Sequence, residues 1–63
     1  METLIYPYAI YTIEEGRKYG IRRYNLVTRV WENLEGCYTE ENSTQELVKE
    51  LNNEAGMILV TIE

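Results

Sequence analysis

The sequence predicts a small α+β domain in which one helix packs on one face of a β-sheet. Stretches rich in Ile, Tyr and Val occupy much of residues 3–31 and favour strands. A helical pattern follows at about 44–55, and a continuous apolar run at 57–62 indicates a last strand. The predicted order is therefore strand, strand, short strand, helix, strand. At 63 residues, a single domain over 1–63 is the expectation.

The first predicted strand covers residues 3–13, where Ile and Tyr favour a pleated conformation. Both alternating sets of its side chains are largely apolar, so we expect both of its faces to be covered. Pro7 has no amide hydrogen, which predicts an edge position or a bulge. Residues 14–18 then form a hairpin loop, because Gly16 supplies the positive φ that such loops require.

The stretch 19–31 allows two interpretations. As a strand, its side chains from residue 24 on point alternately to the two faces of a sheet. The alternation shifts by one residue at 22–23, which suggests a bulge. As a helix it places apolar residues three and four positions apart and ends at Gly36. Its content of Tyr, Val, Thr and Trp favours the strand. Residues 33–36 then form a turn into a short third strand at 37–40.

The helix has the clearest pattern. Residues 43–46, STQE, match a capping box, in which the serine accepts a hydrogen bond from the amide of the glutamate. Apolar residues then recur at helical spacing, so the helix spans about 44–55 and ends at a cap formed by Gly56. The branched, apolar run 57–62 indicates a strand that is covered on both faces.

Missing residue types exclude the common catalytic and metal sites. The 11 acidic residues are all Glu, and the chain has no His, no Asp and one cysteine, Cys37. A Ser-His-Asp or Cys-His-Asp arrangement is impossible within such a chain, and so is a usual zinc site. We therefore predict a protein that is not an enzyme and takes no cofactor or metal.

The cellular compartment is predicted from segments and cysteine pairs that the sequence lacks. No apolar run approaches the roughly 20 residues of a membrane helix, and no basic segment followed by an apolar one begins the sequence as in a signal peptide. A lone cysteine also cannot form an intramolecular disulfide. These features predict a cytoplasmic protein without membrane association.

Charge is distributed unevenly along the chain. Residues 1–31 carry five basic and three acidic side chains, whereas residues 32–63 carry one basic and eight acidic ones. One interpretation is a solvated helix face that keeps a small protein in solution. The other is an acidic surface that docks on a basic partner, as the charged edge of DNA does. The predicted partner-binding residues are Glu32, Glu35, Glu40, Glu41, Glu46, Glu50 and Glu54.

These features predict a non-enzymatic interaction protein that occupies the basic surface of another protein. In size, charge and missing catalytic groups, the chain is similar to the small acidic inhibitors that phages make, some of which imitate DNA. That likeness implies a DNA mimic that blocks a nucleic-acid-binding protein of a host cell.

Two alternatives stay open. The basic, aromatic run 16–25, GRKYGIRRYN, fits a small nucleic-acid-binding regulator that grips phosphate and stacks on bases. The net charge of -5 opposes that interpretation, so we expect the arginines to pair with the acidic half of the same or of a second chain instead. A structural or assembly subunit is the other alternative.

Aromatic content predicts an interface. The chain holds six Tyr and one Trp but no Phe, and amphipathic rings of this kind are enriched where proteins meet. A chain this short buries only roughly 60% of its unfolded surface, so a second copy would complete the core. We therefore predict a homodimer with Tyr6, Tyr8 and Trp31 as contact residues.

Overall fold

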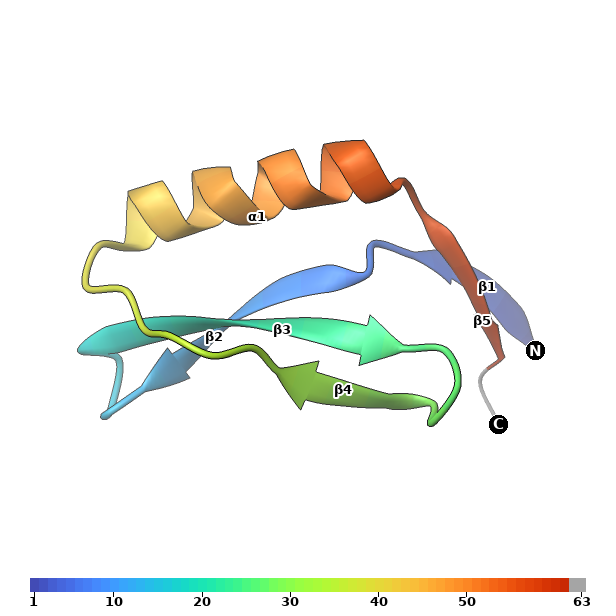
Figure 1. Cartoon of the computed structure of the whole chain (residues 1–63), viewed down its shortest axis with the longest axis horizontal. Coiled ribbons are helices and arrows are strands. Elements are labelled where there is room, and N and C mark those ends of the chain that lie inside the picture. Colours follow the sequence, from blue (N-terminus) through green and yellow to red (C-terminus); the bar gives the residue numbers. More distant parts are fainter. Residues whose placement is uncertain (62–63) are drawn as a thin grey trace.

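The computed structural model describes residues 1–61 and has the predicted α+β fold, with one helix against a sheet (Figure 1). The strands form two antiparallel sheets, one of three strands in the order β2-β3-β4 and one that pairs β1 with β5. The elements are β1 (Glu2–Ile5), β2 (Tyr8–Ile13), β3 (Lys18–Asn25), β4 (Val30–Asn33), α1 (Glu41–Ala55) and β5 (Ile58–Thr61).

The first predicted strand, 3–13, is two strands that belong to different sheets. Pro7 lies buried between β1 and β2, and its carbonyl accepts a hydrogen bond from the amide of Tyr24 at 2.8 Å. The pairing with β3 therefore begins at the Pro7 carbonyl, and the chain passes from one sheet to the other before this residue. The predicted edge position is confirmed, because Pro7 directly precedes β2, an edge strand of its sheet. The chain breaks between two strands there and forms no bulge, because proline has no amide to continue the ladder.

The β2–β3 hairpin forms where Gly16 predicted it. Residues 14–17 make the loop, and Gly16 has a φ of 89°. The two strands then pair in one unbroken register along the whole of β2. The predicted bulge at residues 22–23 is therefore absent.

The stretch 19–31 contains two strands and a turn, so the helical interpretation is wrong. Asn25 forms the turn at residues 26–29, because its Oδ1 accepts hydrogen bonds from the amides of Val27 and Thr28 at 2.8 and 3.2 Å. An asparagine side chain that binds its own backbone two residues ahead is typical of tight turns. The turn folds β4 back on β3. The predicted short strand at 37–40 does not form, and a single bridge takes its place.

That bridge is made by Tyr38. Its amide and carbonyl exchange hydrogen bonds with Tyr19 of β3 at 2.8 and 2.7 Å. The amide of Leu34 also donates to the carbonyl of Ile21 at 2.9 Å. The segment after β4 therefore stays attached to β3 at two points, without forming a further strand, before α1 begins.

The helix begins three residues earlier than predicted, and the capping box is wrong. Glu40 occupies the N-cap position without a side-chain hydrogen bond, and Ser43 is an exposed residue of the first turn. Thr44 is fully buried instead, and its hydroxyl donates to the carbonyl of Glu40 at 2.7 Å. At the other end Gly56 has the predicted positive φ, and its amide donates to the carbonyl of Asn52.

The core lies between α1 and the three-stranded sheet. The helix contacts β2 and β3, and it runs along one side of the sheet (Figure 1). Ile21 in the middle of β3 is only 4% exposed, whereas the apolar helix residues Leu47, Val48 and Leu51 are half-buried. A core this small leaves other apolar groups at the surface.

The β1–β5 pair lies beyond one end of this two-layer body (Figure 1). Val60 points inward and is 8% exposed, but Leu4 and Leu59, directly opposite one another, are 57% and 53% exposed. The expectation that both faces of the last strand are covered is therefore wrong for the chain by itself. Position 62 of the predicted strand lies outside the described residues.

Candidate functional site

Three of the predicted carboxylates share the free side of the helix. Glu46, Glu50 and Glu54, here called the acidic row, lie at four-residue spacing and are all exposed. The buried residues of α1, Thr44 and Asn52, lie on the side that faces the sheet. Within residues 1–61, no basic side chain comes within 4 Å of the acidic row. Lys49 is the one basic residue of α1, so within residues 1–61 the acidic row is a negative edge that the helix offsets only in part.

The other four predicted carboxylates are exposed but lie in different places. Glu40 and Glu41 begin the helix, Glu32 belongs to β4, and Glu35 lies in the segment after β4. Glu41 accepts hydrogen bonds from Tyr and Gln side chains, and Glu32 accepts one from an Asn side chain. The structure therefore brings together only part of the predicted acidic surface, with the acidic row as its continuous element.

The opposite face of the three-stranded sheet gathers aromatic and basic side chains. Tyr19, whose hydroxyl donates to Glu41 of α1 at 3.4 Å, and the buried Ile21 mark the face that the helix covers. Strand alternation places the neighbouring residues on the other face. Here called the open sheet face, it consists of Ala9, Tyr11, Ile13, Lys18, Gly20, Arg22, Tyr24, Trp31 and Asn33.

No carboxylate belongs to the open sheet face, and three of its side chains form a contiguous layer. The rings of Trp31 and Tyr24 meet edge to face, with centroids 5.4 Å apart at an angle of 74°. The guanidinium carbon of Arg22 lies 4.8 Å from the centre of the Trp31 ring, a cation–π contact. The buried Nε of Arg22 has no hydrogen-bond partner. The guanidinium is therefore held against a ring, and no hydrogen bond from it to another group within residues 1–61 accompanies that contact.

A glycine allows a further ring to lie close to the strands. Gly20 of β3 is buried opposite Tyr11 of β2. A Cβ atom added to Gly20 would come within 2.6 Å of Cε1 of Tyr11, well inside van der Waals contact. The outer half of the Tyr11 ring therefore lies directly over the β3 backbone, where only glycine leaves room for it.

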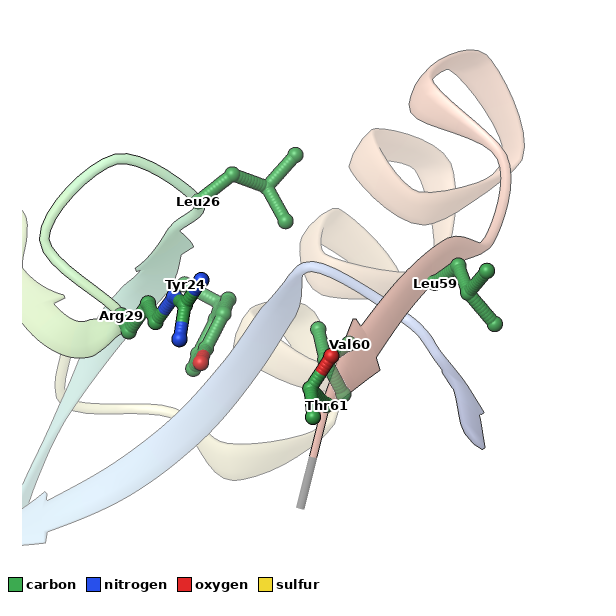
Figure 2. Close-up of a pocket in the computed structure, with 6 residues that line it drawn as sticks. All are labelled: Tyr24, Leu26, Arg29, Leu59, Val60 and Thr61. Carbon is green, nitrogen blue, oxygen red and sulfur yellow. The ribbon is translucent and has the colours of Figure 1, made fainter. Parts of the chain in front are cut away.

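A small hollow borders this face where the β3–β4 turn approaches β5 (Figure 2). Tyr24 and Arg29 line one side, and Val60 and Thr61 line the other, around a volume of about 140 Å³. Arg29 has a φ of 61°, a left-handed conformation that costs a non-glycine residue about 1 kcal/mol. The turn thus holds an arginine in a strained conformation beside the aromatic layer.

The basic run 16–25 is divided between the two faces of the sheet. Arg22 belongs to the open sheet face, whereas Arg23 is exposed on the helix side. Lys18 pairs with Glu14 of the same hairpin at 3.5 Å. Within residues 1–61, no arginine has a carboxylate within 4 Å, so the expected pairing with the acidic half does not occur in one chain. The division could have been predicted from the sequence, because successive side chains of a strand point to opposite faces.

The predicted interface residues do not form one surface. Tyr6 is 52% exposed beside the helix, Tyr8 is half-buried on the helix side, and Trp31 lies on the open sheet face. The structure also brings together two exposed leucines, Leu4 and Leu59, which sequence reasoning did not select. The homodimer itself stays a prediction.

Comparison with known proteins found no matching family model, no matching curated protein and no matching solved structure. No helix within residues 1–61 is both long and apolar enough to cross a membrane. In the same residues, no three His, Cys, Asp or Glu side chains gather in a way that would hold a metal ion. The function must therefore be argued from the two charged faces.

Proposed function

We propose that the protein is a non-enzymatic interaction module whose acidic helix face occupies the basic surface of a nucleic-acid-binding protein. The observation that carries this proposal is the acidic row, three exposed carboxylates without a cation within 4 Å in the described chain. The row is linear, with about 6 Å between successive Cβ atoms. It therefore offers a basic groove a negative edge, as a nucleic-acid strand does.

The energetic cost of the acidic row favours a binding role over a solubilising one. Like charges four residues apart destabilise a helix by a few tenths of a kcal/mol for each pair. Glu54 adds to this cost, because it lies near the C-terminus, where the helix dipole favours a cation and the last turn has none. Mixed charges would keep the protein soluble without this penalty.

The distribution of charge between the two layers also supports the proposal. The acidic row lies on the outer side of α1, and the open sheet face, with Lys18 and Arg22, lies on the far side of the sheet. The helix itself carries one cation, Lys49, so the three carboxylates of the acidic row are only partly offset. Such a local field steers a basic partner and disfavours acidic ones.

The test is capture from a nuclease-treated lysate, followed by measurement with the purified partner. We expect a basic nucleic-acid-binding protein that releases at moderate salt and whose nucleic acid is displaced by this protein. The triple variant Glu46→Gln, Glu50→Gln, Glu54→Gln should bind it about tenfold more weakly or worse. The matched control changes Glu2, Glu14 and Glu15 to Gln, because it removes the same charge from the other half of the chain. Equal binding by the two triple variants at low salt would refute the mimic.

The same module is proposed to be a homodimer, and the outer face of the β1–β5 pair supports this. Leu4 and Leu59 are each about half exposed there, directly opposite one another, and Met57, just before β5, is about half exposed as well. Sedimentation equilibrium of Leu59→Lys should give a monomer. The control Val27→Lys changes a 90% exposed residue of the β3–β4 turn and should leave the assembly intact. A native chain that stays monomeric at high concentration would rule the dimer out.

A further inference from the structure

We propose that the open sheet face binds single-stranded nucleic acid, with bases stacked on Tyr11 and Trp31 and phosphates held by Lys18 and Arg22. This site lies on the opposite side of the sheet from α1 and does not depend on the acidic row. The basic run suggested such binding only in general terms, whereas the fold selects which of its residues take part and adds two rings from other strands.

The shape of the face suits planar ligands. The Tyr11 ring lies over Gly20, and Trp31 is braced by Tyr24 and Arg22, so these rings are held in place before a ligand arrives. Both rings are half-buried, with the sheet behind them. Within residues 1–61, α1 is the element that packs on this sheet, and it covers the other face. Aromatic rings fixed on an uncovered sheet stack on unpaired bases of any sequence.

The charges of the face suit a polyanion. Its strands contribute Lys18 and Arg22 to this face and no carboxylate. Arg29 lies in the turn at one end of β3, and the loop at the other end holds Arg17 together with Glu15 and with Glu14, which pairs with Lys18 at 3.5 Å. Arg22 is held over the Trp31 ring, and no group of the described chain uses its donors. An arginine fixed in this way is available to hydrogen-bond a phosphate. The net charge of -5 belongs mainly to the helix and to the segment before it.

A second protein is a less suitable occupant of this face than a nucleic acid. Tyr, Trp and Arg are enriched in protein interfaces as well, but the buried centre of such an interface is more apolar than its rim. The strongly exposed aliphatic side chains lie outside the face itself, with Val27 in the β3–β4 turn, Leu4 on β1, and Leu26 and Leu59 at the hollow that borders the face. Duplex DNA is also disfavoured, because its bases are stacked inside and cannot reach flat rings on a sheet. The open sheet face therefore points to unpaired bases.

The experiment uses Trp31, the single tryptophan of the chain, as the reporter. The full-length protein is titrated at low salt with oligothymidylate and oligouridylate of about 10 nucleotides. We expect tryptophan fluorescence to fall and to saturate with both single strands, and to change little with a duplex of the same length. No saturable change with either single strand would overturn the proposal.

Neighbouring arginines provide a matched pair of variants. Arg22→Gln and Arg23→Gln remove the same charge from adjacent positions on opposite faces of β3. Arg22→Gln should weaken oligonucleotide binding about tenfold or more, and Arg23→Gln less than about twofold. Equal losses would indicate general charge attraction and would overturn the site. If Arg22→Gln does not fold, Lys18→Gln serves instead, since it removes only a surface ion pair, and it should weaken binding about threefold.

Two further readouts separate this site from its alternatives. The triple Gln variant of the acidic row should bind oligonucleotide as well as the native chain does, so failure of the mimic and failure of this site are distinguishable. A change in tryptophan emission that follows protein concentration alone would assign the face to a second copy of the chain. That result would also overturn the proposal.

Discussion

The side chain of Asn52 takes the place of a neighbouring strand at Tyr8. Its Oδ1 accepts a hydrogen bond from the Tyr8 amide at 2.9 Å, and its Nδ2 donates to the Tyr8 carbonyl at 3.1 Å. β2 is the edge strand of its sheet, so no other strand of the described chain is available to these two groups. Asn52 is 9% exposed. One buried amide therefore fixes the position of α1 relative to the sheet.

Replacing Asn52 should be among the most costly polar substitutions in the protein. Asn52→Ala leaves both backbone groups of Tyr8 without partners, which we expect to lower the free energy of unfolding by about 2–3 kcal/mol. Urea denaturation followed by circular dichroism measures the loss. Asn53→Ala, at the exposed neighbouring position, should change stability by less than about 0.5 kcal/mol. Similar losses for the two variants would contradict the role of Asn52.

Two substitutions test which residue stabilises the start of the helix, Ser43 of the predicted capping box or the buried Thr44. Thr44→Val removes the hydroxyl that donates to the Glu40 carbonyl, and we expect it to cost about 1 kcal/mol. Ser43→Ala should change stability by only a few tenths of a kcal/mol, because Ser43 is exposed and does not cap the helix. Thermal unfolding of both variants checks the order. A larger loss for Ser43→Ala would restore the capping box.

The contact of Tyr11 with the β3 backbone predicts a coupled pair. Gly20→Ala forces a methyl group into the Tyr11 ring and should destabilise the protein by about 1–3 kcal/mol. Tyr11→Ala removes the obstacle, so Gly20→Ala should cost much less in that background. A double-mutant cycle measured by urea denaturation gives the coupling. Additive losses would mean that the ring does not lie over Gly20 in solution.

The strained conformation of Arg29 predicts a stabilising substitution. Glycine adopts a φ of 61° without steric penalty, so Arg29→Gly should range from neutral to about 1 kcal/mol more stable. The same change at Arg17, whose φ is not positive, should bring no gain. Differential scanning calorimetry checks the two variants. A marked loss of stability in Arg29→Gly would show that contacts of the arginine outweigh its strain.

Features that depend on single residues or short patterns were enough to predict the fold class. Features that depend on how distant segments pack were not predicted. Gly16 and Gly56 marked the hairpin and the end of the helix because positive φ is a property of single residues. The turn after Asn25 was hidden, because residues that favour strands, Val27 and Thr28, continue across it. The start of the helix was misplaced, because Ser43 matches a capping pattern in the sequence. The burial of the next residue, Thr44, depends on packing that the sequence does not show.

The candidate site was predicted only where it lies on one element. The acidic row follows from helical spacing, so Glu46, Glu50 and Glu54 share a face as expected. The open sheet face could not be assembled in advance, because Tyr11 and Trp31 meet the basic run only through the pairing of three strands. Arg22 and Arg23 were grouped together in the sequence, whereas the pleat places them on opposite faces.

The pairing of β1 with β5 joins the first and last elements of the described chain, since Glu2 lies opposite Thr61. Forming it closes a loop of nearly the whole chain, whereas each hairpin of the three-stranded sheet closes over four residues. The hairpins should therefore assemble early, and the end-to-end pair should join last and open first. Amide hydrogen exchange at Leu4 and Leu59 would then proceed by local opening, on a shorter timescale than exchange at Ile21. The proposed dimer surface would thus be the least persistent part of the isolated chain, and its lifetime would depend on the second copy.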